Sequence, residues 1–264
     1  MWFTVWTFAS NERPVTRTNM YDCGSVFAAY LARATEKNLF VDRLGGALAQ
    51  EARPLEILDV GAHDGAVTLR YLEAAGKAIW GSRITALDPS ADALGRFRNR
   101  GMAGNFAFDF RLGNAETFVP PAGTAYDWVI ASHSLYWSRD LPEILNHLRK
   151  MGRKMVVVLR DSKGIFQVQS TFQKFLGNPE ERLYTADDIA NAFSQLKITF
   201  RRERVVSHID IPASDDPAMK VLAAFFLQTA PEKLADSTVA EIRKLMTLDG
   251  DRFEHRVSFF WVGE

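Results

Sequence analysis

The chain has 264 residues, a length that suits one large α/β domain or two small ones. Hydrophobic side chains make up 47% of it, so it can bury a core without disulfides or structural metals. The 32 basic and 32 acidic side chains cancel, and no basic block stands out, which argues against a nucleic-acid partner. The single cysteine, Cys23, excludes an internal disulfide and a cysteine-based zinc site. We therefore expect a cytoplasmic protein with no metal.

The first nine residues are apolar and aromatic and carry no side-chain charge. They lack a basic n-region and are too few to cross a bilayer, so we expect neither a signal peptide nor a membrane partner. Packing on the body of the protein is the favoured interpretation, and residues 1–50 together are expected to form an N-terminal lid.

Short apolar runs alternate with helical patterns through the first 160 residues, which predicts a parallel sheet with right-handed crossovers. The last of these runs is apolar on both faces, as is typical of a central strand covered by helices. No linker or internal repeat interrupts the chain, so we expect one domain over residues 1–264. The expected strands are residues 55–60, 84–87, 106–110, 128–131 and 155–159.

Capping residues mark three helix starts. Asp216 precedes a proline at a first helical position, where the missing N–H of proline costs nothing. The other two starts have the spacing of a capping box: Asp140 with Glu143, and Thr185 with Asp188.

The last third of the chain predicts a strand at residues 198–211 and a final strand at residues 257–262. Between them lie two expected helices, residues 217–228 and 231–245. An insertion of this size is too long for a turn, so residues 211–254 are expected to form a helical cap over a pocket.

The most informative stretch is the end of the first expected strand, which runs into a glycine-containing turn and opens a helix. Gly61 permits a turn with positive φ, and Gly65 lets the helix approach the strand with its N–H groups facing the crevice. Ligands of open parallel sheets bind beyond such strand ends, so a ligand should contact residues 59–66. His63 and Ala66 replace glycines of the dinucleotide fingerprint, which weakens a phosphate-binding interpretation.

Two acids follow neighbouring strands. Asp59 lies two residues before the turn and suits a ligand end with an ammonium group, because a carboxylate would repel a pyrophosphate. It could also cap the turn through backbone N–H groups, and the two roles are compatible. Asp88 closes the next strand, where its two oxygens could accept both hydroxyls of a ribose. The ligand implied is a nucleoside with an amino-acid tail.

At this point the sequence resembles the class I S-adenosylmethionine-dependent methyltransferases over roughly residues 20–200. Four segments match in order: residues 59–65 for the methionine end, Asp88 for the ribose, residues 113–118 for the adenine edge, and residues 126–132 as the fourth strand. The resemblance implies an α/β fold: a Rossmann-like, doubly wound, seven-stranded, mostly parallel sheet with an antiparallel last strand, a helical N-terminal lid and a helical cap.

The same resemblance implies S-adenosyl-L-methionine as the cofactor. The family usually has a second glycine where this chain has His63, so the backbone there must adopt a conformation that a Cβ tolerates. The implied cofactor-binding residues are Tyr21, Asp59, Gly61, Ala62, His63, Gly65, Asp88, Pro89, Ser90, Asn114, Ala115, Glu116, Ser132, Tyr136 and Trp137.

After the fourth strand the chain looks most like the histamine N-methyltransferase branch of this family. The segments that resemble it are residues 133–140, 161–166, 183–189 and 256–264. The resemblance places the acceptor pocket near the side chains of His133, Phe166, Tyr184 and His255. The expected catalytic residues are His133, Tyr184 and His255, and the expected substrate-binding residues are Phe166, Tyr184 and His255. A purely structural role for His133 is an equal alternative.

Methyl transfer from S-adenosylmethionine needs positioning and the exclusion of water more than covalent chemistry, although an amine acceptor must lose a proton. The expected function is methylation of a nitrogen or another nucleophile of a small molecule, as in secondary metabolism. Two alternatives stay open. The aminocarboxypropyl arm could be transferred or cyclised with release of methylthioadenosine, or the chain could be a non-catalytic cofactor-binding subunit that regulates a partner.

Overall fold

The computed structural model describes residues 24–100, 104–136, 138–178, 183–213, 216–248 and 250–263. Within these ranges one seven-stranded sheet has the order β3-β2-β1-β4-β5-β7-β6. Neighbouring strands among β1 to β5 pair in parallel, and β7 pairs antiparallel with both β5 and β6. This topology confirms the Rossmann-like sheet with an antiparallel last strand. The strands are β1 (Glu56–Val60), β2 (Arg83–Asp88), β3 (Ala107–Leu112), β4 (Tyr126–Ser132), β5 (Gly152–Arg160), β6 (Arg201–Asp210) and β7 (Arg252–Val262).

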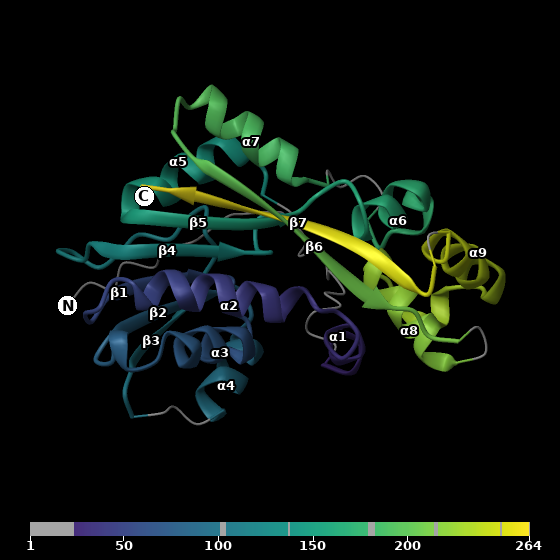
Figure 1. The fold of residues 1–264 in the computed structure, drawn as a ribbon, viewed down its shortest axis with the longest axis horizontal. Coiled ribbons are helices and arrows are strands. Elements are labelled where there is room, and N and C mark those ends of the chain that lie inside the picture. The colour runs from purple at the N-terminus through teal and green to yellow at the C-terminus, as the bar shows by residue number, and fades with distance from the viewer. Residues whose placement is uncertain are drawn as a thin grey trace, which may run out of the picture.

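Helices cover both faces of the sheet (Figure 1). Val156 and Val158 of β5 pack in the same buried cluster as Phe40 of α2, whereas Val157 and Leu159 pack on the side of α5 and α7. A strand that is apolar on both faces therefore lies in the middle of the sheet, as predicted. The helices of this lobe are α2 (Glu36–Ala49), α3 (Ala66–Ala75), α4 (Ala91–Asn99), α5 (Leu141–Met151) and α7 (Ala186–Gln195), with a 3-10 turn η1 (Gly76–Ile79).

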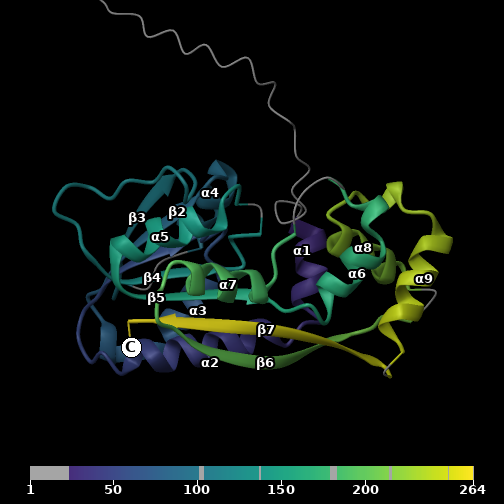
Figure 2. The ribbon, with the colours of Figure 1, turned by 90° about the horizontal axis from the view of Figure 1, so that it is seen from above.

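A second lobe lies beyond the carboxyl ends of the parallel strands (Figures 1 and 2). It contains α1 (Gly24–Leu31), α6 (Ile165–Thr171), α8 (Pro217–Leu227) and α9 (Asp236–Met246), with 3-10 turns η2 (Gln173–Phe175) and η3 (Pro231–Lys233). The helices of this lobe share one buried apolar cluster, which includes Val26, Val168, Phe226 and Ile242. The long strands β6 and β7 run between the lobes, so the cap is continuous with the sheet.

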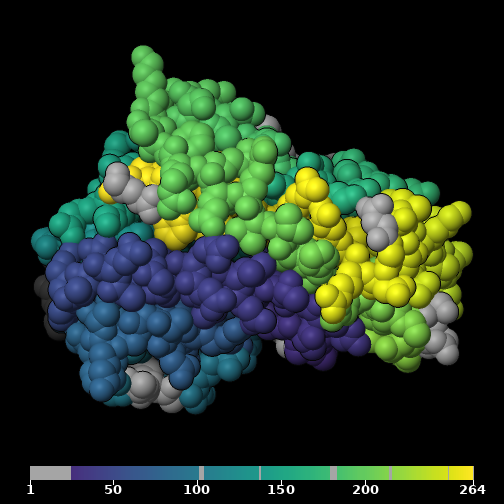
Figure 3. Space-filling view, viewed as in Figure 1, coloured from purple at the N-terminus to yellow at the C-terminus, as the bar shows by residue number. Residues whose placement is uncertain are grey.

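The part of the expected N-terminal lid that the structure describes divides between the two lobes. α1 packs on α8 of the cap, where the ring of Tyr30 stacks on Phe225 at a centroid distance of 4.6 Å. α2 packs on α3 and the sheet and also contacts β6. The space-filling view shows α2 lying across the sheet lobe and α1 beside the cap (Figure 3).

The predicted helix starts are confirmed, and one predicted helix is divided. Asp140 accepts the N–H of Glu143, Thr185 and Asp188 form a reciprocal capping box, and Asp216 accepts the N–H of Ala218. The helix expected over residues 231–245 is instead η3 followed by α9, because Leu234 and Ala235 are extended and Leu234 turns into the cap core. The last strand begins five residues earlier than expected, at Arg252, where it pairs with Asp210.

Among the described residues, no helix has the length and apolar character needed to span a membrane.

Candidate active site

The glycine turn after β1 is shaped by close packing at two positions. Gly61 has a φ of +75°, and a Cβ there would lie 2.4 Å from the Cβ of Ser134. Gly65 has a φ of +72°, and a Cβ there would lie 2.1 Å from the ring of Phe97. Both positions therefore require glycine, for backbone conformation and for space. The turn brings the start of α3 against the end of β1, the cradle that the sequence predicts for a nucleoside ligand.

His63 stands where the family usually has a second glycine, and it adopts the left-handed backbone conformation with a φ of +50°. Histidine is among the residues that enter this region more readily than most. Its backbone N–H donates to Asp88 Oδ2 at 2.8 Å, and its ring meets Phe27 of α1 edge-on at a centroid distance of 5.5 Å. The turn is thus tied to β2 on one side and to α1 on the other.

Asp88 lies at the end of β2, where both of its oxygens are oriented by backbone N–H groups. Oδ2 accepts from His63, and Oδ1 accepts from the N–H of Ser90 at 2.9 Å. Ser90 in turn caps α4 by accepting from Ala93. Each carboxylate oxygen has more than one acceptor site, so this carboxylate retains capacity for hydroxyl donors of a ligand. Pro89 joins Asp88 to the cap of α4.

Asp59 is buried at the end of β1 and is held by two hydroxyls of α3. Its Oδ2 accepts from Thr68 Oγ1 at 2.6 Å and from Tyr71 Oη at 2.9 Å. Burial raises the pKa of Asp59 to about 6, and the nearby charge of Asp88 adds to this, while the two hydroxyls oppose it. Its hydrogen-bond partners in the part of the chain that the structure describes are neutral hydroxyls. This buried carboxylate therefore suits a cationic ligand group, because such a group would remove much of the cost of its charge.

The loop after β3 lies beside Asp88, since the N–H of Gly113 donates to the Asp88 carbonyl at 3.1 Å. Asn114 Oδ1 accepts from both the N–H and the hydroxyl of Thr117, so this amide shapes the turn. Ala115 is buried, and Glu116 is exposed. The predicted segments for the methionine end, the ribose and the adenine edge are therefore neighbours in space. Ser132 ends β4, and the predicted contacts Tyr21 and Trp137 lie outside the described residues.

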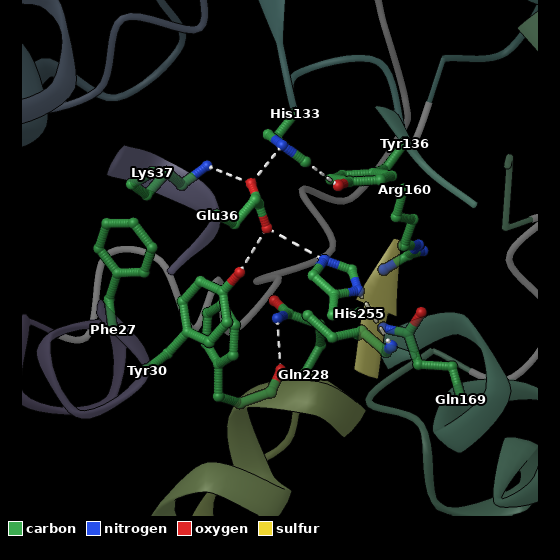
Figure 4. A pocket seen from close by; sticks show the side chains of 12 residues that line it. Phe27, Tyr30, Glu36, Lys37, His133, Tyr136, Arg160, Gln169, Gln228 and His255 are labelled. Carbon is green, nitrogen blue, oxygen red and sulfur yellow. Dashed lines mark hydrogen bonds and ion pairs between the residues drawn. The ribbon is translucent and has the colours of Figure 1, made fainter. Parts of the chain in front are cut away.

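A second group of polar residues lies around Glu36, the first residue of α2, whose side chain is buried (Figure 4). Its Oε2 accepts from Tyr30 Oη at 2.6 Å and lies 3.0 Å from His255 Nε2. Its Oε1 lies 2.5 Å from His133 Nε2 and 3.1 Å from Lys37 Nζ. We call these five residues the Glu36 cluster. The cluster joins His133 and His255, which the sequence analysis identifies, through the carboxylate of Glu36, which the sequence analysis does not identify.

The charges of the Glu36 cluster follow from burial and pairing. Burial lowers the pKa of His133 to about 4, against the attraction of Glu36. Burial also pushes the pKa of Glu36 upward, but His133, Lys37 and the hydrogen bond from His255 outweigh it and hold that pKa well below its usual value. At neutral pH the cluster therefore contains an ionised Glu36 and a neutral His133, with Lys37 beside the carboxylate.

Tyr136 extends this cluster toward β5. Its hydroxyl makes a short hydrogen bond with His133 Nδ1, and the guanidinium of Arg160 lies over its ring at 4.2 Å. Arg160 is the last residue of β5 and is buried. The sequence predicts Tyr136 as a cofactor contact, and in the structure its hydroxyl is hydrogen-bonded to His133, the expected catalytic histidine.

The Glu36 cluster lines a pocket between the sheet and the cap. About 20 Å³ of it is open to the centre of a water molecule, which is room for one water. Figure 4 shows these side chains converging from α1, α2, β7 and the cap. The lining residues are Phe27, Tyr30, Glu36, Lys37, His133, Tyr136, Arg160, Ile165, Gln169, Phe225, Gln228 and His255.

Two predicted acceptor residues are not among the described residues that line this pocket. Tyr184 is buried in the core cluster on the side of α5 and α7, and Phe166 lies half-buried on α6. Glu36, Lys37 and Arg160 were in turn missed from the sequence. Glu36 follows Thr35 at a helix start, where an acid is ordinary, so no local pattern distinguishes it.

Comparison with known proteins agrees with this geometry. Residues 58–154 match the family model described as a methyltransferase domain. A search of curated proteins finds no match.

Solved structures share the fold at low identity. Magnesium protoporphyrin IX methyltransferase from Synechocystis, with bound SAH, is 10% identical with a TM-score of 0.51, covering 97% of this chain and 90% of that one. The plantazolicin methyltransferase, in complex with SAH, is 12% identical with a TM-score of 0.52, covering 94% of each chain. The cyclopropane synthase MmaA2 from Mycobacterium tuberculosis is 12% identical with a TM-score of 0.57, covering 85% of this chain and 83% of that one.

These matches support the class I resemblance and give no support to the histamine N-methyltransferase branch. S-adenosyl-L-methionine is the cofactor that the matched domain and fold imply. The chain has the fold of the class I S-adenosylmethionine-dependent methyltransferases, with a methyltransferase domain matched over residues 58–154.

Proposed function

We propose that this protein transfers the methyl group of S-adenosylmethionine to a nitrogen or another nucleophile of a small molecule. The observation that carries the proposal is the Glu36 cluster, in which the buried Glu36 and His255 meet the half-buried His133 and Lys37 beyond the strand ends of a methyltransferase fold. Buried ionisable groups with strongly displaced pKa values gather at functional sites more often than elsewhere.

On the cofactor side, the glycine turn and the two strand-end acids fit S-adenosylmethionine. Asp88 would accept the ribose hydroxyls, and Asp59 would face the ammonium group, with the loop of Asn114 along the adenine. The bound cofactor supplies an activated methyl group. The protein then has to hold the acceptor in line and keep water out, which is why a closed site matters more than a nucleophilic side chain.

On the acceptor side, the pocket joins an aromatic wall to the polar Glu36 cluster. Phe27, Tyr30 and Phe225 form the wall, and the cap closes over it. An enclosed site of this kind fits a small molecule better than a polymer lying in an open groove. His133 is the proposed catalytic residue, His255 supports it by holding Glu36, and Tyr184 and Phe166 enter the proposal through the family resemblance alone.

The test is product analysis after incubation of the full-length protein with S-adenosylmethionine and a panel of small amines, phenols and carboxylic acids. Methyl transfer yields S-adenosylhomocysteine (SAH) and an acceptor heavier by one methylene unit, as read by mass spectrometry. Release of methylthioadenosine instead would contradict methyl transfer and favour attack at the aminocarboxypropyl arm. Cofactor binding by calorimetry without either product would favour a regulatory subunit.

A further inference from the structure

We infer that Glu36 is the positioning residue of a proton relay. Its carboxylate holds both histidines with their protons on Nε2, which leaves Nδ1 of His133 as the site that takes the acceptor's proton through the hydroxyl of Tyr136. This inference rests on the proposed function and names the residues that handle the proton at that site.

The proton positions follow from what a carboxylate can do. An ionised carboxylate only accepts hydrogen bonds, so each group that faces Glu36 must point a proton at it. His133 Nε2 lies 2.5 Å and His255 Nε2 lies 3.0 Å from its oxygens. His133 is therefore held with its proton on Nε2 and a lone pair on Nδ1. His255 Nδ1 accepts from the backbone N–H of Ile165, so it too has a lone pair there and its proton on Nε2. Tyr30 and Lys37 supply the remaining protons.

The two lone pairs face different surroundings. His255 Nδ1 faces the backbone N–H of Ile165 at 3.5 Å, and a Cβ on Gly164 would lie 2.5 Å from it, so backbone closes off this nitrogen. His133 Nδ1 instead meets the hydroxyl of Tyr136, which lines the pocket. His255 is thus an anchor for Glu36, and His133 is the residue that can exchange a proton with the pocket.

The relay conserves protons. When the acceptor gains the methyl group, its N–H or O–H proton passes to Tyr136 Oη as the hydroxyl proton of Tyr136 passes to His133 Nδ1. Tyr136 is unchanged, and His133 becomes an imidazolium against the Glu36 carboxylate. The charges that face this pair are Lys37 beside Glu36 and Arg160 over the ring of Tyr136. After product leaves, His133 returns its proton to water.

The chain offers a matched control just beyond the other end of the same helix. Glu51 follows α2 and accepts from Lys154 Nζ at 2.8 Å and from Trp128 Nε1 at 3.0 Å. It resembles Glu36 in pairing with a lysine and a ring N–H, but that ring belongs to Trp128 and not to a histidine of the cluster. Glu51→Gln therefore tests the loss of a paired carboxylate without touching the relay.

The experiment is nitrogen NMR of the full-length protein labelled with 15N-histidine, with SAH present. Signals are assigned from His133→Asn and His255→Asn. We expect both histidines of the wild type to show the Nε2–H tautomer near neutral pH. Glu36→Gln should change the tautomer of at least one of them, because its amide donates where the carboxylate accepted, whereas Glu51→Gln should change neither. A wild-type His133 with its proton on Nδ1, or an equal response to both variants, would overturn the inference.

A second readout applies once an acceptor is known. Glu36→Gln and Tyr136→Phe should each lower kcat at least tenfold and alter its pH profile, with SAH affinity by calorimetry within about threefold of the wild type. Glu36→Asp should recover part of the rate. Unchanged kcat in both variants would refute the relay while leaving methyl transfer intact. If no acceptor is found, the NMR result still decides the tautomers independently of the proposed function.

Discussion

Asp59 and Glu36 are both buried carboxylates, yet their pKa values are displaced in opposite directions. Asp59, at the proposed cofactor end, is hydrogen-bonded to two neutral hydroxyls, and burial raises its pKa to about 6. Glu36, at the proposed acceptor end, has Lys37 and two histidines as neighbours, and its pKa is held well below the usual value. Burial alone therefore does not decide whether a carboxylate is charged; the partners do. The proposed cofactor end would gain a cation from its ligand, whereas the proposed acceptor end has Lys37 beside its carboxylate.

The largest difference should appear in stability at neutral pH. Glu36→Ala should lower the free energy of unfolding by about 3–5 kcal/mol, because it leaves Lys37 and two histidine N–H groups without their buried partner. Asp59→Ala should cost about 1–3 kcal/mol, because only two neutral hydroxyls lose their acceptor. Urea unfolding at pH 7 measures both. Equal losses would mean that Lys37 does not stabilise the Glu36 cluster.

The next-largest expected effect is on SAH affinity and concerns Asp88, at the proposed cofactor end. Asp88→Asn should weaken SAH binding by about 2–3 kcal/mol, roughly 30- to 150-fold, because it removes the charge from the proposed hydrogen bonds to the ribose. Titration calorimetry gives the affinity, and the thermal midpoint shows whether the variant remains folded. A folded variant with wild-type affinity would remove Asp88 from the cofactor site.

These two regions also differ in how far the sequence predicts them. Asp59, Gly61, Gly65 and Asp88 lie within 30 residues of chain and follow strands whose apolar pattern is plain, so local reasoning identifies the turn and its neighbours. The Glu36 cluster joins residues as far apart in the sequence as Tyr30 and His255, and no local sequence pattern predicts that they contact the same carboxylate. His133 was identified because it follows a predicted strand at the edge where ligands bind, and through the family resemblance.

The fold shows the same limit. Apolar runs place every strand, but the beginning of β7 was missed because residues 252–256 are mostly polar and become a strand only by pairing with β6. The break between η3 and α9 was missed because the helical pattern continues across it, and the burial of Leu234 in the cap core overrides local propensity.

A third prediction separates Asp59 from His133 of the Glu36 cluster by the pH dependence of stability. The folded pKa of Asp59 lies above its unfolded value of about 3.9, so its contribution to stability falls as the pH rises from about 4 to about 6. The folded pKa of His133 is lowered to about 4, so its contribution rises over about pH 4 to 6.5. Asp59→Asn should therefore gain about 2 kcal/mol relative to the wild type between pH 4 and pH 7. Urea unfolding across this range measures the gain, and parallel curves would contradict the raised pKa.

The smallest expected effect concerns Phe27, whose ring lies between His63 of the cofactor turn and Phe225 of the cap. Phe27→Ala should weaken SAH binding about two- to tenfold, which corresponds to the loss of about 0.5–1.5 kcal/mol of aromatic contact. Val26→Ala, on the same helix but in the cap core, is the control and should leave SAH affinity within twofold. Equal effects of both variants would mean that α1 acts through the cap as a whole and not through His63.

The order of the strands determines when the sheet can be completed during synthesis on the ribosome. β7 lies between β5 and β6 and pairs with both, although it is the last strand of the chain. β6 therefore has no place in the sheet until β7 has been synthesised, and the edge of β5 stays open until then. His255 belongs to β7, so Glu36 obtains one of its two imidazole partners only in this final step. A nascent chain that has formed the glycine turn after β1 therefore still has an incomplete sheet. It lacks β7, the strand that completes the proposed acceptor pocket.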